Sequence, residues 1–238
     1  MLNPPIASPQ NLRVLLADLQ SMRVSGGGQS APRKARPFVT ISRVPGARYT
    51  ELAQALADRL NQLDRDETPW TVWDRQVLEK VAADRHLSTE VIDSLEESSQ
   101  SWLVNLFAGL PGHSGSIDPD AVFKSVAHTV TALAQVGRTI IVGYGGVLLT
   151  RRLGGVHVCP VAAPEDRVKW LAESERLDLV EAARQLEELD QKRLDFIRRY
   201  WPRESLGPAH FTLTVNMSDL SVQTAADIIS QLVLMRRS

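Results

Sequence analysis

The sequence has 238 residues, with 27 lysines and arginines, 28 aspartates and glutamates, and a formal net charge of −1. This near-neutral balance argues against a polybasic protein that binds nucleic acid, so nucleic acid is not an expected partner. The single cysteine, Cys159, excludes an internal disulfide and a metal site made of several cysteines. No stretch is long and apolar enough to cross a membrane, and we expect a cytoplasmic protein without a membrane partner.

Two segments precede the main body of the chain. Residues 1–24 contain leucines and a methionine at helical spacing, which predicts an amphipathic N-terminal helix. Residues 25–37 are rich in Gly, Ser, Pro and basic residues and lack apolar periodicity, which indicates a flexible linker. The helix is expected to dock on its own domain, and self-association or a protein partner is the alternative. Three basic residues in the linker are too few for more than weak, salt-sensitive contact with nucleic acid.

Residues 38–238 alternate short apolar runs with amphipathic segments. The predicted strands are 38–42, 70–73, 139–142, 156–160 and 211–215. The predicted helices are 49–63, a segment from 74 onward, 88–97, 100–108, 118–135, a short one ending at 152, one opening at 164, 178–200 and 222–235, with a loop at 110–116. This alternation is typical of an α/β fold with a parallel sheet covered on both faces.

The loop after the first predicted strand is a candidate phosphate site. A strand, a tight loop and a helix in this order can present backbone N–H groups and the positive end of the helix dipole to an anion. In the pattern G-x-x-x-x-G-K-[ST], the glycines let the backbone approach phosphate and the lysine neutralises it. Gly46 and Thr50 fit this pattern. Arg43, Arg48 and Tyr49 stand in the places of the two glycines and the lysine, so an ordinary turn also remains open.

Other candidate residues follow later strands or lie on the long charged helix. Asp74 and Arg75 follow the second predicted strand, where an aspartate is equally expected as a helix N-cap beside a solvated arginine. The run GYGG after the third strand lacks the third glycine of a dinucleotide fingerprint and is interpreted as a tight turn. Asp190 and Arg193 share one helix face, and arginine suits bidentate contacts with phosphate. A charge-rich helix is more commonly a solvated face.

The sequence predicts no metal site built from protein side chains. The five histidines lack the spacing of a zinc-binding helix, and His157 and Cys159 are only two ligands on one predicted strand. We therefore interpret both as packing residues. No G-x-S-x-G run is present, so a hydrolase of that kind is not expected.

Taken in order, short segments of the chain resemble the cytidylate kinase-like proteins, which are P-loop relatives of the nucleoside monophosphate kinases. The segments that carry the resemblance are VTISR at 39–43, WDRQVL at 73–78, HLS at 86–88, IIVG at 140–143, APEDR at 163–167, D-x-x-R at 190–193 and VN at 215–216. The resemblance covers about residues 39–234. It implies a three-layer α/β fold with a five-stranded parallel sheet and a lid around the long helix.

The resemblance also implies a reaction and a set of site residues. The parent reaction is transfer of the γ-phosphate of ATP, with Mg²⁺, to a pyrimidine nucleoside monophosphate such as CMP. The expected ligand is thus a nucleotide or a phosphorylated small molecule. The residues implied for donor phosphates are Gly46, Ala47, Arg48, Tyr49 and Thr50. Those implied for the substrate are Asp74, Arg75, Tyr144 and Asp190, with Arg75 on the acceptor phosphate and Arg193 on the transferring group.

The departures from the family pattern concern these same positions. The family loop G-S-G-G-R has become Gly46-Ala47-Arg48-Tyr49-Thr50, and Tyr144 stands where the family has an arginine. Loss of one cation or amide from such a site costs on the order of 10²–10³ in rate. We expect kinase activity that is weakened or lost, with Arg48 as a replacement for the missing charge. The alternative is a non-catalytic module, derived from a kinase, that binds a nucleotide or a protein.

Overall fold

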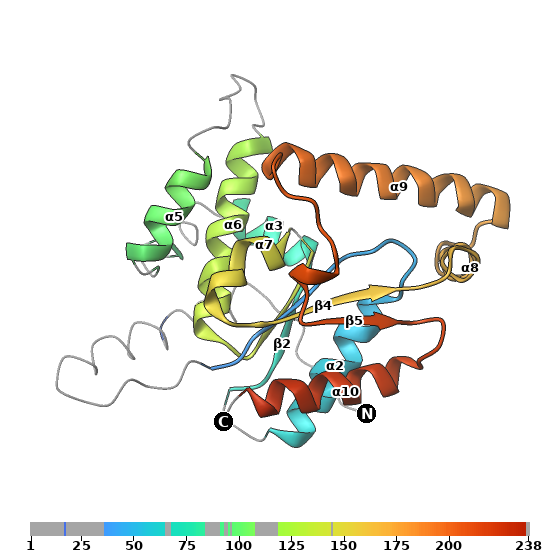
Figure 1. Cartoon of the computed structure of the whole chain (residues 1–238), viewed down its shortest axis with the longest axis horizontal. Helices are drawn as coiled ribbons and strands as arrows, with labels where there is room; N and C mark the ends of the chain where they lie inside the picture. Colours follow the sequence, from blue (N-terminus) through green and yellow to red (C-terminus); the bar gives the residue numbers. More distant parts are fainter. Residues whose placement is uncertain are drawn as a thin grey trace.

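The computed structural model describes residue 17 and residues 36–64, 68–83, 91–92, 95, 97–107, 119–143 and 145–236. Its five strands are β1 (Val39–Ile41), β2 (Thr71–Trp73), β3 (Thr139–Val142), β4 (Val156–Val161) and β5 (Leu213–Asn216). They form one sheet in the order β2-β3-β1-β4-β5, and every neighbouring pair is parallel (Figure 1). The predicted five-stranded parallel sheet is confirmed.

Helices cover both faces of this sheet, so the fold has three layers. The helices are α2 (Tyr49–Leu63), α3 (Arg75–Ala83), α5 (Glu97–Phe107), α6 (Pro119–Val136), α7 (Gly146–Thr150), α8 (Pro164–Glu175), α9 (Leu179–Tyr200) and α10 (Val222–Met235). Helices α2 and α10 pack together on one face, while α3, α6 and α7 lie on the other (Figure 1). The predicted α/β class is thereby confirmed.

The central strands are buried on both sides, which explains their apolar, β-branched sequences. Because neighbouring side chains of a strand point to opposite faces, Ile140 and Val142 pack against α2 and α10. Ile141, between them, packs in the second core with α3 and α6. One apolar core therefore lies on each face of the sheet, and the two cores together hold the strands in place.

A buried ion pair joins the end of α2 to the start of β3. Arg138, in a left-handed conformation with φ 54°, donates a hydrogen bond to the carboxylate of Asp64 and another to its backbone carbonyl at 3.0 Å. Its guanidinium carbon lies 5.6 Å from the ring centroid of Trp70, whose indole N–H also faces Asp64. Both charged side chains are almost completely buried, so each needs the other as its partner.

Two of the differences between the observed and the predicted bounds have a local reason. The fifth strand starts at Leu213 and not at residue 211, because the N–H of Phe211 closes a 3-10 turn, η3 (Pro208–His210), by bonding Pro208. The predicted short helix ending at 152 is divided into α7 and a second 3-10 turn, η2 (Arg151–Leu153).

Several predicted features lie outside the described residues. They are the N-terminal helix apart from residue 17, the linker up to residue 35, most of the predicted helix at 88–97, the loop at 110–116, and Tyr144.

Candidate functional site

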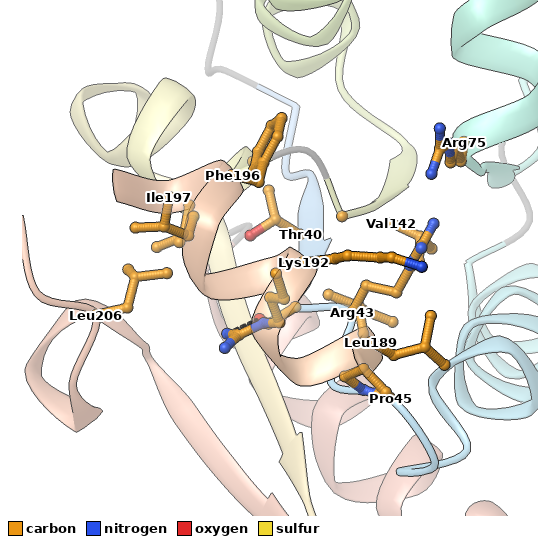
Figure 2. Close-up of a pocket in the computed structure, with 17 residues that line it drawn as sticks. Thr40, Arg43, Pro45, Arg75, Val142, Leu189, Lys192, Phe196, Ile197 and Leu206 are labelled. Carbon is orange, nitrogen blue, oxygen red and sulfur yellow. Dashed lines mark hydrogen bonds between the residues drawn. The ribbon is translucent and has the colours of Figure 1, made fainter. Parts of the chain in front are cut away.

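A pocket of about 240 Å³ lies between the carboxyl ends of β1 and β3 and one side of α9 (Figure 2). Parallel sheets bind their ligands at this edge, where the loops leave the strands. The residues that line it are Thr40, Ile41, Ser42, Arg43, Pro45, Arg75, Val142, Gly143, Gly145, Gly146, Val147, Leu189, Lys192, Arg193, Phe196, Ile197 and Leu206.

The charge of this lining is positive. Arg43, Arg75, Lys192 and Arg193 line the pocket, and no acidic residue does so within the described part of the chain. Figure 2 shows Arg43 and Lys192 extending toward the side of the pocket on which Arg75 lies. Neither Arg43 nor Lys192 forms an ion pair with any residue that the structure describes. Such a cluster of cations in a hollow surface favours an anionic group.

Arg193 is held at the end of β1. Its guanidinium donates a hydrogen bond to the Oγ of Ser42 at 3.1 Å. The backbone N–H of Ser42 in turn donates to Val158 at 2.8 Å, which fixes that residue to the neighbouring strand β4. Burial raises the pKa of the nearby Cys159 thiol, and the charge of Arg193 partly opposes this rise. Arg193 is therefore positioned by the sheet itself as well as by α9.

Asp190 lies one turn before Arg193 but has a different partner. Both of its carboxylate oxygens accept hydrogen bonds from Arg167 of α8, at 2.7 and 2.9 Å. The Nε of Arg167 donates to the backbone carbonyl of Pro45 at 2.7 Å. The predicted substrate residue Asp190 thus does not line the pocket, and it connects α9 to α8 and to the loop after β1.

The loop after β1 is tightly closed against α8. The N–H of Ala47 bonds the carbonyl of Val44 at 3.1 Å, which makes a turn around Pro45 and Gly46. Gly46 has φ 71°, and a Cβ added there would lie 2.6 Å from the backbone oxygen of Arg167. Only glycine satisfies both the backbone angle and the close approach.

The five residues predicted for donor phosphates occupy this loop and the start of α2, and none of them lines the pocket. Arg48 adopts a left-handed conformation (φ 52°), and its Nε donates a hydrogen bond to Glu51 at 3.1 Å. Its guanidinium carbon lies 5.4 Å from the ring centroid of Trp170 on α8. Tyr49 packs against the α2–α10 core, and Thr50 is exposed.

The other predicted substrate residues differ in whether they line the pocket. Arg75 begins α3 and lines the pocket, and its Nε donates to Glu79 at 2.8 Å. Asp74 directly precedes α3 and is exposed, with its backbone carbonyl bonded to the N–H of Leu78. Tyr144 lies outside the described residues, although its neighbours Gly143 and Gly145 line the pocket.

Sequence reasoning missed four pocket residues on α9, which are Leu189, Lys192, Phe196 and Ile197. Together with Arg193 they follow the i, i+3, i+4, i+7, i+8 spacing of one helix face. That spacing could have identified all four once Arg193 was selected as a candidate. Arg43 was noted only as a replaced glycine, yet it contributes a charge to the pocket.

An aromatic cluster fixes the far end of α9. Phe196 packs at right angles to Phe123, with ring centroids 5.5 Å apart, and edge-on to Tyr200 at 5.1 Å. Trp201 also contacts Phe123, and its ring lies where a Cβ on Gly145 would be, only 2.5 Å away. Burial and the carboxylate of Asp120 raise the pKa of Tyr200 to about 12. The cluster holds Phe196 against the pocket.

His157 supports the floor of the pocket as a neutral side chain. Its Nδ1 lies 2.8 Å from the Oγ1 of Thr40, which lines the pocket. Burial, and secondarily the charge of Arg236, lowers the pKa of His157 to about 4. Across the described residues, the His, Cys, Asp and Glu side chains form no group of three or more that could hold a metal ion.

Comparison with known proteins agrees with the resemblance seen in the sequence. A model of the cytidylate kinase-like family matches residues 38–219. The crystal structure of an uncharacterized protein from Eubacterium ventriosum ATCC 27560 aligns with a TM-score of 0.65 and 15% sequence identity, covering 84% of this chain and 99% of that chain. At this identity the likeness concerns the fold alone. A search of curated proteins gave no match. Among the described helices, none has the length and hydrophobicity that a bilayer crossing needs.

Proposed function

The chain belongs to the cytidylate kinase-like family, and we propose that its pocket binds the phosphoryl group of a nucleotide, with a pyrimidine nucleoside monophosphate such as CMP as the ligand. The observation that carries this proposal is the set of four cations, Arg43, Arg75, Lys192 and Arg193, in a pocket whose described lining contains no acidic residue. The pocket also lies at the carboxyl edge of the sheet, where this class of fold binds its ligands.

The arrangement of these cations suits a phosphate. Arginine presents a planar fork of N–H donors, and lysine a point charge, so together they neutralise and orient a dianion. Arg193 already donates to Ser42, which limits the rotation of its side chain before any ligand binds. A hydrogen bond of this charged kind contributes about 1.5–3 kcal/mol, so each arginine that contacts phosphate strengthens binding by about 10–100-fold.

We propose further that phosphoryl transfer from ATP is weak or lost in this chain. The donor loop of a P-loop kinase surrounds phosphate with backbone N–H groups, and its glycines allow the close approach. Here Arg48 takes a glycine position and turns its side chain to Glu51 and Trp170, away from the pocket. Arg167 also packs directly on Gly46. These contacts support a role in binding without efficient catalysis.

The described residues do not form a site for Mg²⁺. This ion prefers carboxylate oxygens together with phosphate oxygens, and no carboxylate lines the described part of the pocket. Thr50 stands at the position of the loop hydroxyl that holds the metal in P-loop proteins, and it is exposed outside the pocket.

The experiment combines binding and turnover on the full chain. CMP is titrated calorimetrically at two salt concentrations, and ADP release from ATP and Mg²⁺ with CMP is followed in a coupled assay. We expect CMP to bind more weakly at higher salt, with little or no turnover. Binding with efficient turnover would contradict the loss of catalysis, and absence of binding would contradict the proposed ligand.

A matched pair of variants tests the residues. Arg193→Ala should weaken CMP binding by about 10–100-fold. Arg198→Ala removes an exposed arginine of the same helix that lies outside the pocket and should change the affinity by no more than about twofold. Equal effects of the two variants would show that the phosphate binds elsewhere.

A further inference from the structure

We infer that the pocket recognises the base of its ligand by apolar contact alone, so that it binds a pyrimidine monophosphate without distinguishing cytosine from uracil. This inference rests on the proposed function, because it assumes that the phosphate lies among the cations of the pocket.

The pocket has two unlike ends. Figure 2 shows Phe196, Ile197 and Leu206 on one side of it, away from the side that Arg43, Lys192 and Arg75 occupy. A ligand with its phosphate at the cations therefore places its remaining part against apolar side chains. An aromatic or other flat ring buries apolar surface well in such a place.

The apolar end has a fixed shape. Phe196 is held by ring contacts with Phe123 and Tyr200, at centroid distances of 5.5 and 5.1 Å. Ile197 is buried, and Leu206 packs against the same apolar core from the segment that follows α9. A surface held in this way has its final shape before the ligand binds, so binding costs little conformational entropy.

Among the described residues, the lining offers no acidic or amide side chain to read the base. Cytosine presents an amino donor where uracil presents a carbonyl acceptor, so a side chain that distinguishes cytosine must accept a hydrogen bond at this position. Among the described residues that line the pocket, none is Asp, Glu, Asn or Gln. The two hydroxyls already have partners, since Thr40 is 2.8 Å from His157 and Ser42 accepts from Arg193.

The size of the pocket agrees with one small ligand. Its volume of about 240 Å³ lies below the range of roughly 300–1,000 Å³ usual for ligand pockets. One nucleoside monophosphate is therefore a better match than a donor and an acceptor nucleotide together.

The test measures the affinities of five probes for the full chain by calorimetry: CMP, UMP, phenyl phosphate, ribose 5-phosphate and inorganic phosphate. We expect CMP and UMP to bind within about threefold of each other, because no described acceptor separates them. CMP, UMP and phenyl phosphate should each bind about tenfold or more tightly than ribose 5-phosphate and inorganic phosphate, because only these three bury an aromatic ring.

Variants of the apolar end complete the test. Phe196→Ala should lower the affinities for CMP, UMP and phenyl phosphate by about tenfold and leave the affinity for inorganic phosphate unchanged. Leu194→Ala, an exposed position of the same helix outside the pocket, serves as the matched control. Leu206→Ala makes the same measurement at a second position if Phe196→Ala fails to fold.

The outcomes separate this inference from the proposed function. A preference of about 30-fold or more for CMP over UMP, with phosphate binding intact, would overturn the inference alone. Unchanged affinities for CMP, UMP and phenyl phosphate in both Phe196→Ala and Leu206→Ala would also overturn the inference alone. If none of the five probes binds, the proposed function itself is wrong.

Discussion

The contact between Gly46 and α8 gives a prediction whose magnitude follows from the geometry. A Cβ at Gly46 would lie 2.6 Å from the backbone oxygen of Arg167 and 2.9 Å from its Cβ. Because those atoms belong to the helix itself, they cannot move aside as the end of a flexible side chain could. Gly46→Ala should therefore displace α8 from the loop and destabilise the protein.

Gly154 provides the matched control. It has φ 77°, close to the 71° of Gly46, but a Cβ there meets nothing within 4 Å. Gly154→Ala thus incurs only the strain of a left-handed alanine, about 1–2 kcal/mol, partly offset by a less flexible unfolded chain. Gly46→Ala adds an overpacking penalty of about 1–3 kcal/mol to the same strain.

The assay is urea unfolding followed by circular dichroism, with the free energy of unfolding compared between the two variants. We expect Gly46→Ala to be less stable than Gly154→Ala by about 1–3 kcal/mol. It should also weaken CMP binding, because Pro45 beside it lines the pocket and accepts a hydrogen bond from Arg167. Equal destabilisation by the two variants would refute the close packing of α8 against this loop.

Three further predictions concern Arg138, His157 and Arg48. Arg138→Met should lower the free energy of unfolding by about 3–5 kcal/mol, because it removes the cation that pairs with the buried carboxylate of Asp64; urea unfolding measures this, and a loss below about 1 kcal/mol would contradict the buried pair. Because the folded protein holds the pKa of His157 at about 4, below the ordinary histidine value of 6.5, the unfolded chain binds more protons between these pH values. Stability should therefore be retained above pH 6.5 and fall, by up to about 3 kcal/mol, as the pH drops toward 4; denaturation at pH 7 and pH 5 should show a smaller decrease in His157→Gln than in the wild type, and an equal decrease would exclude His157 as its source. Arg48→Ala should leave the affinity for CMP within about twofold, because that side chain lies outside the pocket; a tenfold loss in calorimetry would return Arg48 to the site.

The order and the bounds of most elements could be predicted from the sequence, because they depend on local periodicity. Helices α2 and α10 begin and end where their apolar spacing predicts. Asp178 marks the start of α9 as its N-cap, with its carboxylate accepting the N–H of Glu181 at 2.8 Å. The strand order β2-β3-β1-β4-β5 was not predicted, because periodicity does not show which strands are neighbours. The resemblance to a known family implied only five parallel strands, which the pairing confirms.

The candidate site could be predicted only in part, since side-chain direction depends on tertiary packing. The D-x-x-R pattern selected two residues of α9, yet Asp190 binds Arg167 while Arg193 binds Ser42. That division depends on where α8 lies, which no local pattern encodes. Arg48 is a similar case, because Trp170 comes close to it only once α8 has packed beside the loop.

The most direct measurement is a crystal structure of the full chain soaked with CMP. The account predicts the phosphate within hydrogen-bond distance of Arg193 and Lys192, with the base against Phe196. Phosphate bound instead at the Gly46–Thr50 turn, with the pocket below α9 empty, would contradict it.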